Sequence, residues 1–355
     1  MGVLISEMTT PLIEAARIAV PAPRFATAET EASTATTPAP IVGIVILDYN
    51  GLADTLQCLV SLRSVRYNNV SVYVIDNGSA EDDASIVASA FPDVLVHRNA
   101  DNLGFALGAN QGMQLALRDG AEYVLFLNND AVVQPDSVPK LVDAMERDPN
   151  LGICGPAILH SHGRTIQNLG YVYNPWFGWA RAVGASRAVG WRPKEPHRIA
   201  WLMGCALLCR RSLLVQTGGF DADFFLYWED HHLCWKAKQI GFSIAVVPDA
   251  TVLHRKTVGS EFSKRHVYHM FLGQITFVAK TAKWWQKPTL SLGMCAVALA
   301  YALLGLARRG SFVVPVIWQA VADFYTGHPK RHVIFDSLRH RVKDTLFRLL
   351  GKRFL

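Results

Sequence analysis

The 355-residue chain is poor in charge and contains no closely paired cysteines. Only 18% of its residues are Asp, Glu, Lys or Arg, whereas 50% are hydrophobic. That composition is apolar for a soluble enzyme and suggests contact with a membrane. The six cysteines form no CxxC pair and lie mostly in apolar stretches, so we expect buried, reduced thiols in a cytosolic compartment.

Several signature motifs are also missing. We find no recognised nucleic-acid-binding motif, so the net charge of +6, concentrated from Lys280 onward, suits an anionic membrane surface better than a nucleic acid. The glycine-rich segment 102–110 matches neither GxGxxG nor the P-loop pattern. Residues 1–40 lack the basic start and unbroken apolar core of a secretory signal. We expect a disordered leader there, with room for a short helix near Pro11–Val20.

From Ile41 onward, apolar strands alternate with amphipathic helices. Strands are predicted at 41–47, 70–75, 94–96 and 123–127, and helices at 52–63, 82–90 and from the glycine-rich segment to Arg118. This alternation with short connections is typical of a doubly wound, mostly parallel α/β sheet. Three strand ends, at 48–50, 76–79 and 128–130, would then lie along one edge, where ligands bind in open α/β sheets.

The polar residues at these strand ends have two interpretations. Asp76 either forms an Asx turn before Gly78 or accepts hydrogen bonds from a base or ribose. Asp130 either ends a strand in a turn or helps to hold a divalent cation together with substrate phosphates. Asn128 and Asn129 offer donors and acceptors to a sugar or nucleotide. The convergence of three such strand ends favours a binding site.

The second half of the chain carries the acidic pair Glu229–Asp230 beside aromatic residues. Asp230 precedes a helical pattern that closes at Gly241, so it can cap that helix, and it can also act as a general base toward a hydroxyl. His254 follows a further strand and is either a structural histidine or a metal ligand. The Tyr- and Trp-rich run 171–201 suits stacking on sugar rings or packing in a core or loop.

Together these motifs resemble the inverting family 2 glycosyltransferases of the GT-A fold, in particular their rhamnosyltransferase-like branch. The resemblance covers about Ile41 to Ser260, and the ordered set is far more specific than any one member. The matching segments are Asp48–Gly51, Asp76–Ser79, Asn102–Asn110, Asn128–Asp130, Gly218–Asp221, Glu229–Asp230 and His254. The resemblance implies a GT-A domain at 41–270, with a nucleotide-binding half at 41–130 and an acceptor half at 131–270.

The resemblance also implies a role for each site residue. Asp230 would be the catalytic base with Glu229 beside it, and Asp130 and His254 would hold Mg²⁺ or Mn²⁺. The expected substrate-binding residues are Tyr49, Asn50, Asp76, Asn102, Gly104, Asn110, Asn128, Asn129, Gly204 and Trp228.

The chain departs from the family pattern at three places. Asn128 stands where a DxD motif has its first aspartate, which leaves one carboxylate and shifts metal binding toward the diphosphate. His232 stands where the family often has a second acid. The basic run that begins at Arg255 replaces a glycine-rich loop, so basic side chains are expected to meet the diphosphate.

The expected activity is transfer of one sugar, with rhamnose as the branch-level expectation, from a dTDP- or UDP-sugar to a hydroxyl of a glycan or polyprenyl-linked acceptor in cell-envelope polysaccharide synthesis. A processive synthase would need a QxxRW-like motif, which we do not find. The alternative is a non-catalytic nucleotide-sugar-binding scaffold on the membrane. The presence of both Asp130 and Asp230 argues against it.

The C-terminal region, residues 271–355, is expected to be helical, basic and apolar. Its uncharged runs Thr289–Ala307 and Gly310–Ala322 allow a helical hairpin on the membrane surface, a true span, or helices packed on the catalytic domain. Arg331–Leu355 has the pattern of a basic amphipathic helix suited to an anionic surface. We therefore expect a peripheral or monotopic enzyme at the cytoplasmic face of the inner or plasma membrane, with its catalytic domain in the cytoplasm.

Overall fold

The computed structural model describes residues 38–193, 195–255, 263–307 and 313–327. The strands are β1 (Val42–Asp48), β2 (Val70–Asp76), β3 (Leu95–Arg98), β4 (Tyr123–Asn128), β5 (Ala131–Val133), β6 (Leu151–His160), β7 (Ile166–Asn168), β8 (Tyr171–Asn174), β9 (Trp179–Ala182), β10 (His197–Arg198), β11 (Ala206–Arg210) and β12 (Ser243–His254). The helices are α2 (Leu52–Leu62), α3 (Asp83–Ala90), α4 (Phe105–Arg118), α5 (Ser137–Arg147), α6 (Arg211–Thr217), α7 (Glu229–Gln239), α8 (Lys264–Thr281), α9 (Lys287–Ala307) and α10 (Val313–Thr326), with short 3₁₀ turns η1 (Val189–Trp191) and η3 (Trp284–Gln286).

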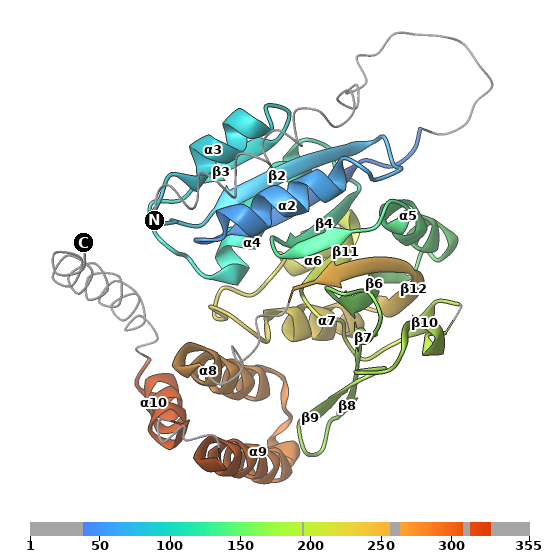
Figure 1. The fold of residues 1–355 in the computed structure, drawn as a ribbon. Helices are drawn as coiled ribbons and strands as arrows, with labels where there is room; N and C mark the ends of the chain where they lie inside the picture. Colours follow the sequence, from blue (N-terminus) through green and yellow to red (C-terminus); the bar gives the residue numbers. More distant parts are fainter. Residues whose placement is uncertain (1–37, 194, 256–262, 308–312, 328–355) are drawn as a thin grey trace, which may run out of the picture.

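A ten-stranded mixed sheet forms the centre of the molecule (Figure 1). Its main order is β10-β12-β6-β11-β4-β1-β2-β3, with β5 added to β12 and β7 added to β6. The strands β4, β1, β2 and β3 are mutually parallel, as predicted, whereas β11 runs antiparallel to both β4 and β6. The predicted α/β sheet is confirmed, and β11 joins its two halves.

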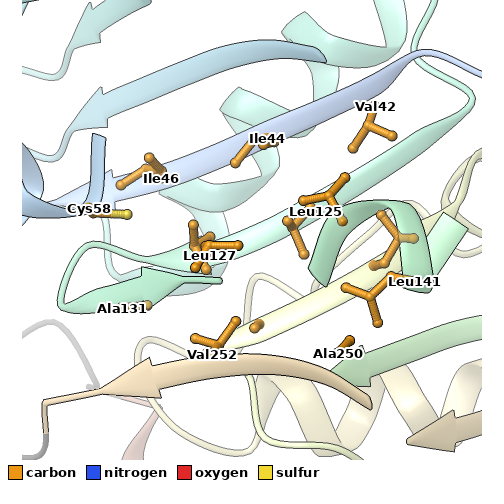
Figure 2. Close-up of a cluster of buried hydrophobic side chains, with 14 of the residues drawn as sticks. Val42, Ile44, Ile46, Cys58, Leu125, Leu127, Ala131, Leu141, Ala250 and Val252 are labelled. Atoms are coloured by element: carbon orange, nitrogen blue, oxygen red, sulfur yellow. The ribbon is translucent and has the colours of Figure 1, made fainter. Parts of the chain in front are cut away.

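Helices bury both faces of this sheet, which explains the unbroken apolar runs in the central strands. Successive side chains point to opposite faces, so Ile44 and Leu125 pack with α2, α3 and α5, whereas Val45 and Phe126 pack with α4, α6 and α7. Figure 2 shows the first of these clusters between β1, β4 and β12. Each fully buried large side chain of this kind contributes about 1.5–3 kcal/mol.

The register of the parallel strands brings the predicted polar ends together. Asp48 pairs with Asp76 across β1 and β2, and Leu47 pairs with Asn128 across β1 and β4. The three strand ends therefore lie at one edge of the sheet, as the alternation of strands and helices predicts.

The aromatic-rich run 171–201 folds partly into the β8–β9 hairpin, which the sequence pattern does not reveal. Trp201 is buried against Tyr173, with ring centroids 4.5 Å apart, whereas Trp176 and Phe177 at the hairpin tip are exposed. The run thus supplies both core packing and exposed aromatics. Five of the six cysteines are buried and reduced, and Cys295 is exposed.

The C-terminal helices α8, α9 and α10 form a separate small layer beside the sheet domain (Figure 1). Val267 and Phe271 of α8 pack with Val313 of α10, while Leu292 and Leu299 of α9 stay exposed. Among the residues that the structure describes, no helix is both long and apolar enough to cross a membrane. The helices predicted near 11–20 and over 331–355 lie outside the described residues, as does most of the predicted leader.

Candidate active site

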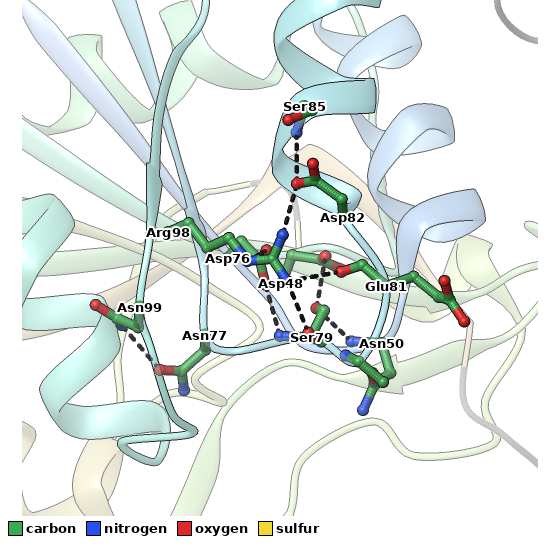
Figure 3. A network of polar contacts seen from close by, with 11 residues as sticks. Asp48, Asn50, Asp76, Asn77, Ser79, Glu81, Asp82, Ser85, Arg98 and Asn99 are labelled. Atoms are coloured by element: carbon green, nitrogen blue, oxygen red, sulfur yellow. Dashed lines mark hydrogen bonds and ion pairs between the residues drawn. The ribbon is translucent and has the colours of Figure 1, made fainter. Parts of the chain in front are cut away.

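The loop after β1 is held by a buried carboxylate at the edge of the sheet (Figure 3). Asp48 Oδ1 accepts hydrogen bonds from Thr55 Oγ1 at 2.8 Å and from Asn129 Nδ2 at 3.0 Å. Ser79 Oγ accepts a hydrogen bond from the backbone N–H of Asn50 at 2.9 Å. The predicted residues Asn50 and Asn129 are thus brought to the same place, because β1, β2 and β4 end side by side.

Asp76 is completely buried at the end of β2, and the protein already engages its carboxylate. Its Oδ1 accepts a hydrogen bond from the backbone N–H of Ser79 at 2.9 Å, and its Oδ2 lies 3.3 Å from Arg98 Nε. Arg98 also donates to the carbonyl oxygens of Ser79 and Glu81 (Figure 3). In this structure Asp76 therefore stabilises the turn that follows β2, and its role toward a base or ribose stays a prediction.

Asn102 and Gly104 form a tight connection before α4. Asn102 Oδ1 accepts hydrogen bonds from Asn77 Nδ2 at 3.1 Å and from the Gly104 N–H at 2.8 Å. Gly104 has φ +83°, and a Cβ there would lie 2.6 Å from the carbonyl oxygen of Phe225. Only glycine fits this position. The backbone next to Gly104 contacts Phe225, so the nucleotide-binding half predicted for residues 41–130 packs here against a segment of the second half.

Asn110 faces a segment that lies far away in the sequence. Its side chain donates to the carbonyl oxygen of Phe220 at 2.8 Å and accepts from the Phe220 N–H at 2.9 Å. Both amide groups are therefore occupied by the turn that contains Gly219. Asn110 holds that turn in place.

Asp130 and His254 meet at the end of the β5–β12 pairing. Ala131 pairs with His254 in the sheet, and His254 Nε2 lies 3.2 Å from Asp130 Oδ1. On the other side of the ring, His254 Nδ1 lies 3.0 Å from Gln167 Oε1. Because the amide oxygen only accepts hydrogen bonds, the proton is assigned to Nδ1, and the Nε2 lone pair can then bind a cation that Asp130 also contacts.

This pair has the chemistry of half a metal site. Asp130 Oδ1 is buried and accepts no hydrogen bond within the described part of the chain. A carboxylate oxygen and an imidazole nitrogen 3.2 Å apart can be adjacent ligands of one cation. The described residues contain no group of three or more His, Cys, Asp or Glu side chains arranged to hold a metal. The residues present therefore fit a cation that takes its other ligands from substrate or water.

Asp230 lies in the first turn of α7. Its Oδ2 accepts a hydrogen bond from the Gly204 N–H at 2.7 Å, and its Oδ1 accepts one from the His231 N–H at 2.7 Å. The predicted capping role is wrong, since α7 begins at Glu229 and Trp228 occupies the N-cap position. An acidic residue in the first turn is still stabilised by the helix dipole.

The two acids of the pair differ in the direction of their pKa shifts. Burial and the neighbouring Asp230 raise the pKa of Glu229 well above its usual value. Burial also acts to raise the pKa of Asp230, but His231 and the N–H groups of Gly204 and His231 outweigh it and lower that pKa. The two pKa values are therefore pushed apart, a separation typical of acid and base assignments.

The backbone before this pair is strained. Tyr227 and Trp228 have φ values of +67° and +73°, a region that bulky residues rarely occupy. Helix α8 packs directly on them, because a Cβ at Gly273 would lie 2.7 Å from the carbonyl oxygen of Tyr227. Trp228 is 6% exposed and packs on Phe277 of α8. Trp228, which was predicted to bind substrate, thus packs in the aromatic cluster next to Asp230.

Cys205 lies between the two halves of the site. Its carbonyl oxygen accepts a hydrogen bond from the Asn128 N–H, and β11 begins one residue later beside β4. Burial raises the pKa of its thiol well above the usual value, and the charges of Asp130 and Asp230 both add to that rise. Cys205 also follows Gly204, whose N–H bonds to Asp230, so this short segment links the end of β4 to the start of α7.

Three contact residues escaped the sequence analysis. Arg98 pairs with Asp76 across neighbouring strands, Gln167 orients His254, and His231 contacts Asp230. Adjacency to Asp230 was a usable signal for His231. Gln167 and His254 are 87 positions apart, and no local pattern predicts their contact.

Asp83 gives this edge a pH-dependent stability. Burial and the charge of Asp48 raise the pKa of Asp83 from 3.8 to about 7. Between those values the folded chain binds more protons than the unfolded chain, so the free energy of unfolding falls as the pH rises from ~4 to ~7. We expect Asp83→Asn to flatten this slope in urea unfolding at a series of pH values. The matched change Asp101→Asn, at an exposed position, should leave the slope unchanged; an equal slope in all three proteins would contradict the assignment.

Solved structures share this architecture. The chain superposes on GalNAc-T7 with UDP, GalNAc and Mn²⁺ with a TM-score of 0.54 and 15% identity, covering 69% of this chain and 48% of that one. The mannosyltransferase PcManGT from Pyrobaculum calidifontis, in complex with GDP-Man and Mn²⁺, gives a TM-score of 0.50 and 16% identity over 90% of this chain and 97% of its own. These likenesses concern the fold, and the predicted GT-A-like fold is confirmed.

Sequence comparison agrees with the fold. The chain is 28% identical to N-acetylglucosaminyl-diphospho-decaprenol L-rhamnosyltransferase of Mycobacterium tuberculosis over 275 residues, which cover 70% of this chain and 87% of the relative. It is 22% identical to the low-salt glycan biosynthesis hexosyltransferase Agl10 of Haloferax volcanii, over 82% and 94% of the two chains. Residues 43–214 match the model of glycosyl transferase family 2. The chain is a glycosyltransferase, and it resembles family 2, as its motifs predict.

Proposed function

We propose that this enzyme transfers one sugar, with inversion, from a nucleotide-diphosphate sugar to a hydroxyl of a lipid-linked glycan in cell-envelope polysaccharide synthesis. The observation that carries the proposal is the placement of the Asp130–His254 pair and of Asp230 at one sheet edge, where the Asn128 N–H bonds to the Cys205 carbonyl oxygen and the adjacent Gly204 N–H bonds to Asp230. The named activity of the mycobacterial relative supports rhamnose as the first sugar to test, on the dTDP- or UDP-sugar donors that the motifs lead us to expect.

The donor would lie along the edge formed by residues 41–130. Tyr49 is partly exposed there, with the Arg265 guanidinium 5.6 Å from its ring centroid, so an aromatic face and a cation are available to a base and a phosphate. Asp130 and His254 would hold Mg²⁺ or Mn²⁺ together with the diphosphate. When bound, such a cation stabilises the negative charge of the leaving nucleoside diphosphate.

The acceptor would approach from the half formed by residues 131–270. Asp230 takes the proton of the acceptor hydroxyl while that oxygen attacks the anomeric carbon from the face opposite the diphosphate. Gly204 N–H holds the second carboxylate oxygen at 2.7 Å. Burial and the charge of Asp230 raise the pKa of Glu229 while that of Asp230 is lowered, so Asp230 is the member of the pair that we assign as the base.

The exposed aromatics near α9 suit a membrane surface, which a lipid-linked acceptor requires. Trp284 is 78% exposed, and the β8–β9 tip adjoins the start of α9 through a hydrogen bond from Gln286 to the Pro175 carbonyl oxygen. We define the aromatic surface as Trp176, Phe177, Trp284 and Trp285. Segments 171–182 and 280–293, which carry it, contain lysines and an arginine but no acid. Tryptophan with basic residues is typical of the headgroup region of a bilayer. We place the enzyme at the cytoplasmic face of the inner or plasma membrane.

The base assignment predicts that Asp230→Asn folds but is nearly inactive. Replacing the carboxylate with an amide removes the proton acceptor and should lower kcat about 10²–10⁴-fold. Release of dTDP from dTDP-rhamnose, with a polyprenyl-diphosphate-linked acceptor, measures the rate. The matched change Asp249→Asn, at an exposed position, should retain full activity. A substantially active Asp230→Asn enzyme would refute the assignment, and a wild type that hydrolyses or transfers no donor would favour the scaffold alternative.

The metal assignment predicts cation-dependent donor binding. A donor present at about 100 times its dissociation constant should stabilise the folded enzyme by about 2.7 kcal/mol, measured as a rise in Tm. We expect this rise with one of the dTDP-, UDP- or GDP-sugars and only when Mg²⁺ or Mn²⁺ is added. Asp130→Asn should abolish the cation dependence, whereas Asp249→Asn should preserve it. An unchanged response in Asp130→Asn would place the cation elsewhere.

The membrane assignment predicts loss of vesicle binding when the aromatic surface is changed. Two exposed tryptophans that insert into the bilayer would provide a large apolar contact with lipid. The double change Trp284→Ser and Trp285→Ser should therefore weaken binding at least about tenfold. Co-flotation with vesicles that contain anionic phospholipid measures the effect. Trp191→Ser, at an exposed tryptophan outside this surface, is the control. Equal flotation of the double variant and the control would contradict the proposed surface.

A further inference from the structure

His231 touches the Asp230 carboxylate through two of its own groups. Its backbone N–H donates to Asp230 Oδ1 at 2.7 Å, and its ring Nδ1 lies 2.5 Å from the same oxygen. An ionised carboxylate only accepts hydrogen bonds, so the proton between them is assigned to Nδ1. The side chain of His231 is therefore a donor aimed at the oxygen next to the reacting centre.

Aromatic rings hold the imidazole in this orientation. Its centroid lies 4.3 Å from that of Trp201, 4.8 Å from that of Trp228 and 5.6 Å from that of Tyr171. Trp201 and Trp228 are themselves buried, so the ring has little room to rotate.

The second carboxylate oxygen is held from the opposite side. Asp230 Oδ2 accepts the Gly204 N–H, and a Cβ at Gly204 would lie 3.1 Å from that oxygen, which is closer than most Cβ contacts. Gly204 can thus fix one oxygen but supplies no side chain to fix the other. Only the His231 ring and backbone hold Oδ1 among the contacts that the structure gives for it.

We propose that His231 is a positioning residue for the transfer reaction, whose Nδ1–H holds the Asp230 carboxylate in the orientation that receives the acceptor proton. This inference rests on the proposed function. In the step, the acceptor O–H bond breaks and its proton passes to Asp230. The acceptor oxygen bonds to the anomeric carbon as the bond to the diphosphate breaks. His231 keeps its own proton throughout.

The charges around His231 give the proposal a measurable signature. The ionisable neighbours of Asp230 are Glu229 and Cys234 on the same helix, Tyr171 on β8 and Cys205 before β11, and burial raises the pKa of each. Burial also acts to raise the pKa of Asp230, and His231 is the largest influence that lowers it. Removing the imidazole should therefore raise the pKa of Asp230 and move the acid limb of the rate profile to higher pH.

The experiment compares His231→Ala with His231→Asn, whose amide N–H can lie near the position of Nδ1. With the donor that the wild type uses, His231→Ala should lower kcat about 10–100-fold, with little change in the KM of the donor, and should shift the acid limb of kcat upward. His231→Asn should recover most of the rate. If both variants lose activity equally, with unmoved acid limbs, the role is structural and the proposal is wrong; full activity of His231→Ala also overturns it.

A second measurement does not depend on turnover. ¹⁵N-histidine NMR of the wild type, with His231→Asn to assign the signal, reports which ring nitrogen of His231 carries the proton. We expect a proton on Nδ1 that is perturbed by Asp230→Asn. A bare Nδ1 would overturn the proposal even if no donor were turned over, and inactivity of the wild type with this NMR signature present would count against the proposed function alone.

Discussion

The backbone pairing of β1 with β2 and β4 is the constraint on which the whole site depends. It places Asp48 opposite Asp76 and the end of β4 beside both, so that Asn129 can reach the Asp48 carboxylate. Helices cover both faces of these strands, and a slip of one residue would move every side chain to the opposite face and out of its packed cluster. Each buried polar group at this edge would cost about 1–3 kcal/mol if its partner were lost, so the turns that carry Asn50 and Asn129 are held firmly.

The convergence of the ends of β1, β2 and β4 could be predicted, because parallel strands end at the same edge of a sheet. The contacts of the residues at this edge could not be predicted. Asn110 looks like part of the glycine-rich loop, yet its amide bonds to the Phe220 backbone, 110 positions away. Asp76 similarly turns inward to Arg98.

The second half of the site depends on strand pairings without a local signal. The meeting of His254 with Asp130 requires β12 to pair with β5, and its orientation requires β7 to bring Gln167 alongside. The start of α7 was predicted two residues too late, because an N-cap with left-handed backbone is expected at glycine and is occupied here by Trp228. Asp230 does lie at the start of this helix, whereas its hydrogen-bond partners were visible only in three dimensions.

The distribution of negative charge connects these features. The proposed site would receive an anionic diphosphate, yet it is built from carboxylates. Burial raises the pKa of Glu229 and of the Cys205 thiol, His254 lies against Asp130, and His231 with two backbone N–H groups lowers the pKa of Asp230. A low-dielectric interior disfavours a negative charge unless hydrogen bonds or an opposite charge stabilise it.

The close approach of Gly273 to Tyr227 has a consequence for the modular character of the chain. The family match ends at residue 214, and Asp230 follows it in the chain. The residues just before Asp230 have left-handed backbone and are contacted closely by Gly273 of α8, which comes later still in the sequence. The matched segment thus ends before α7, and the proposed catalytic end of α7 is completed by the same helical layer that carries exposed aromatics. Exchange of that layer between relatives would alter both the place where the enzyme works and the shape of the pocket in which it works.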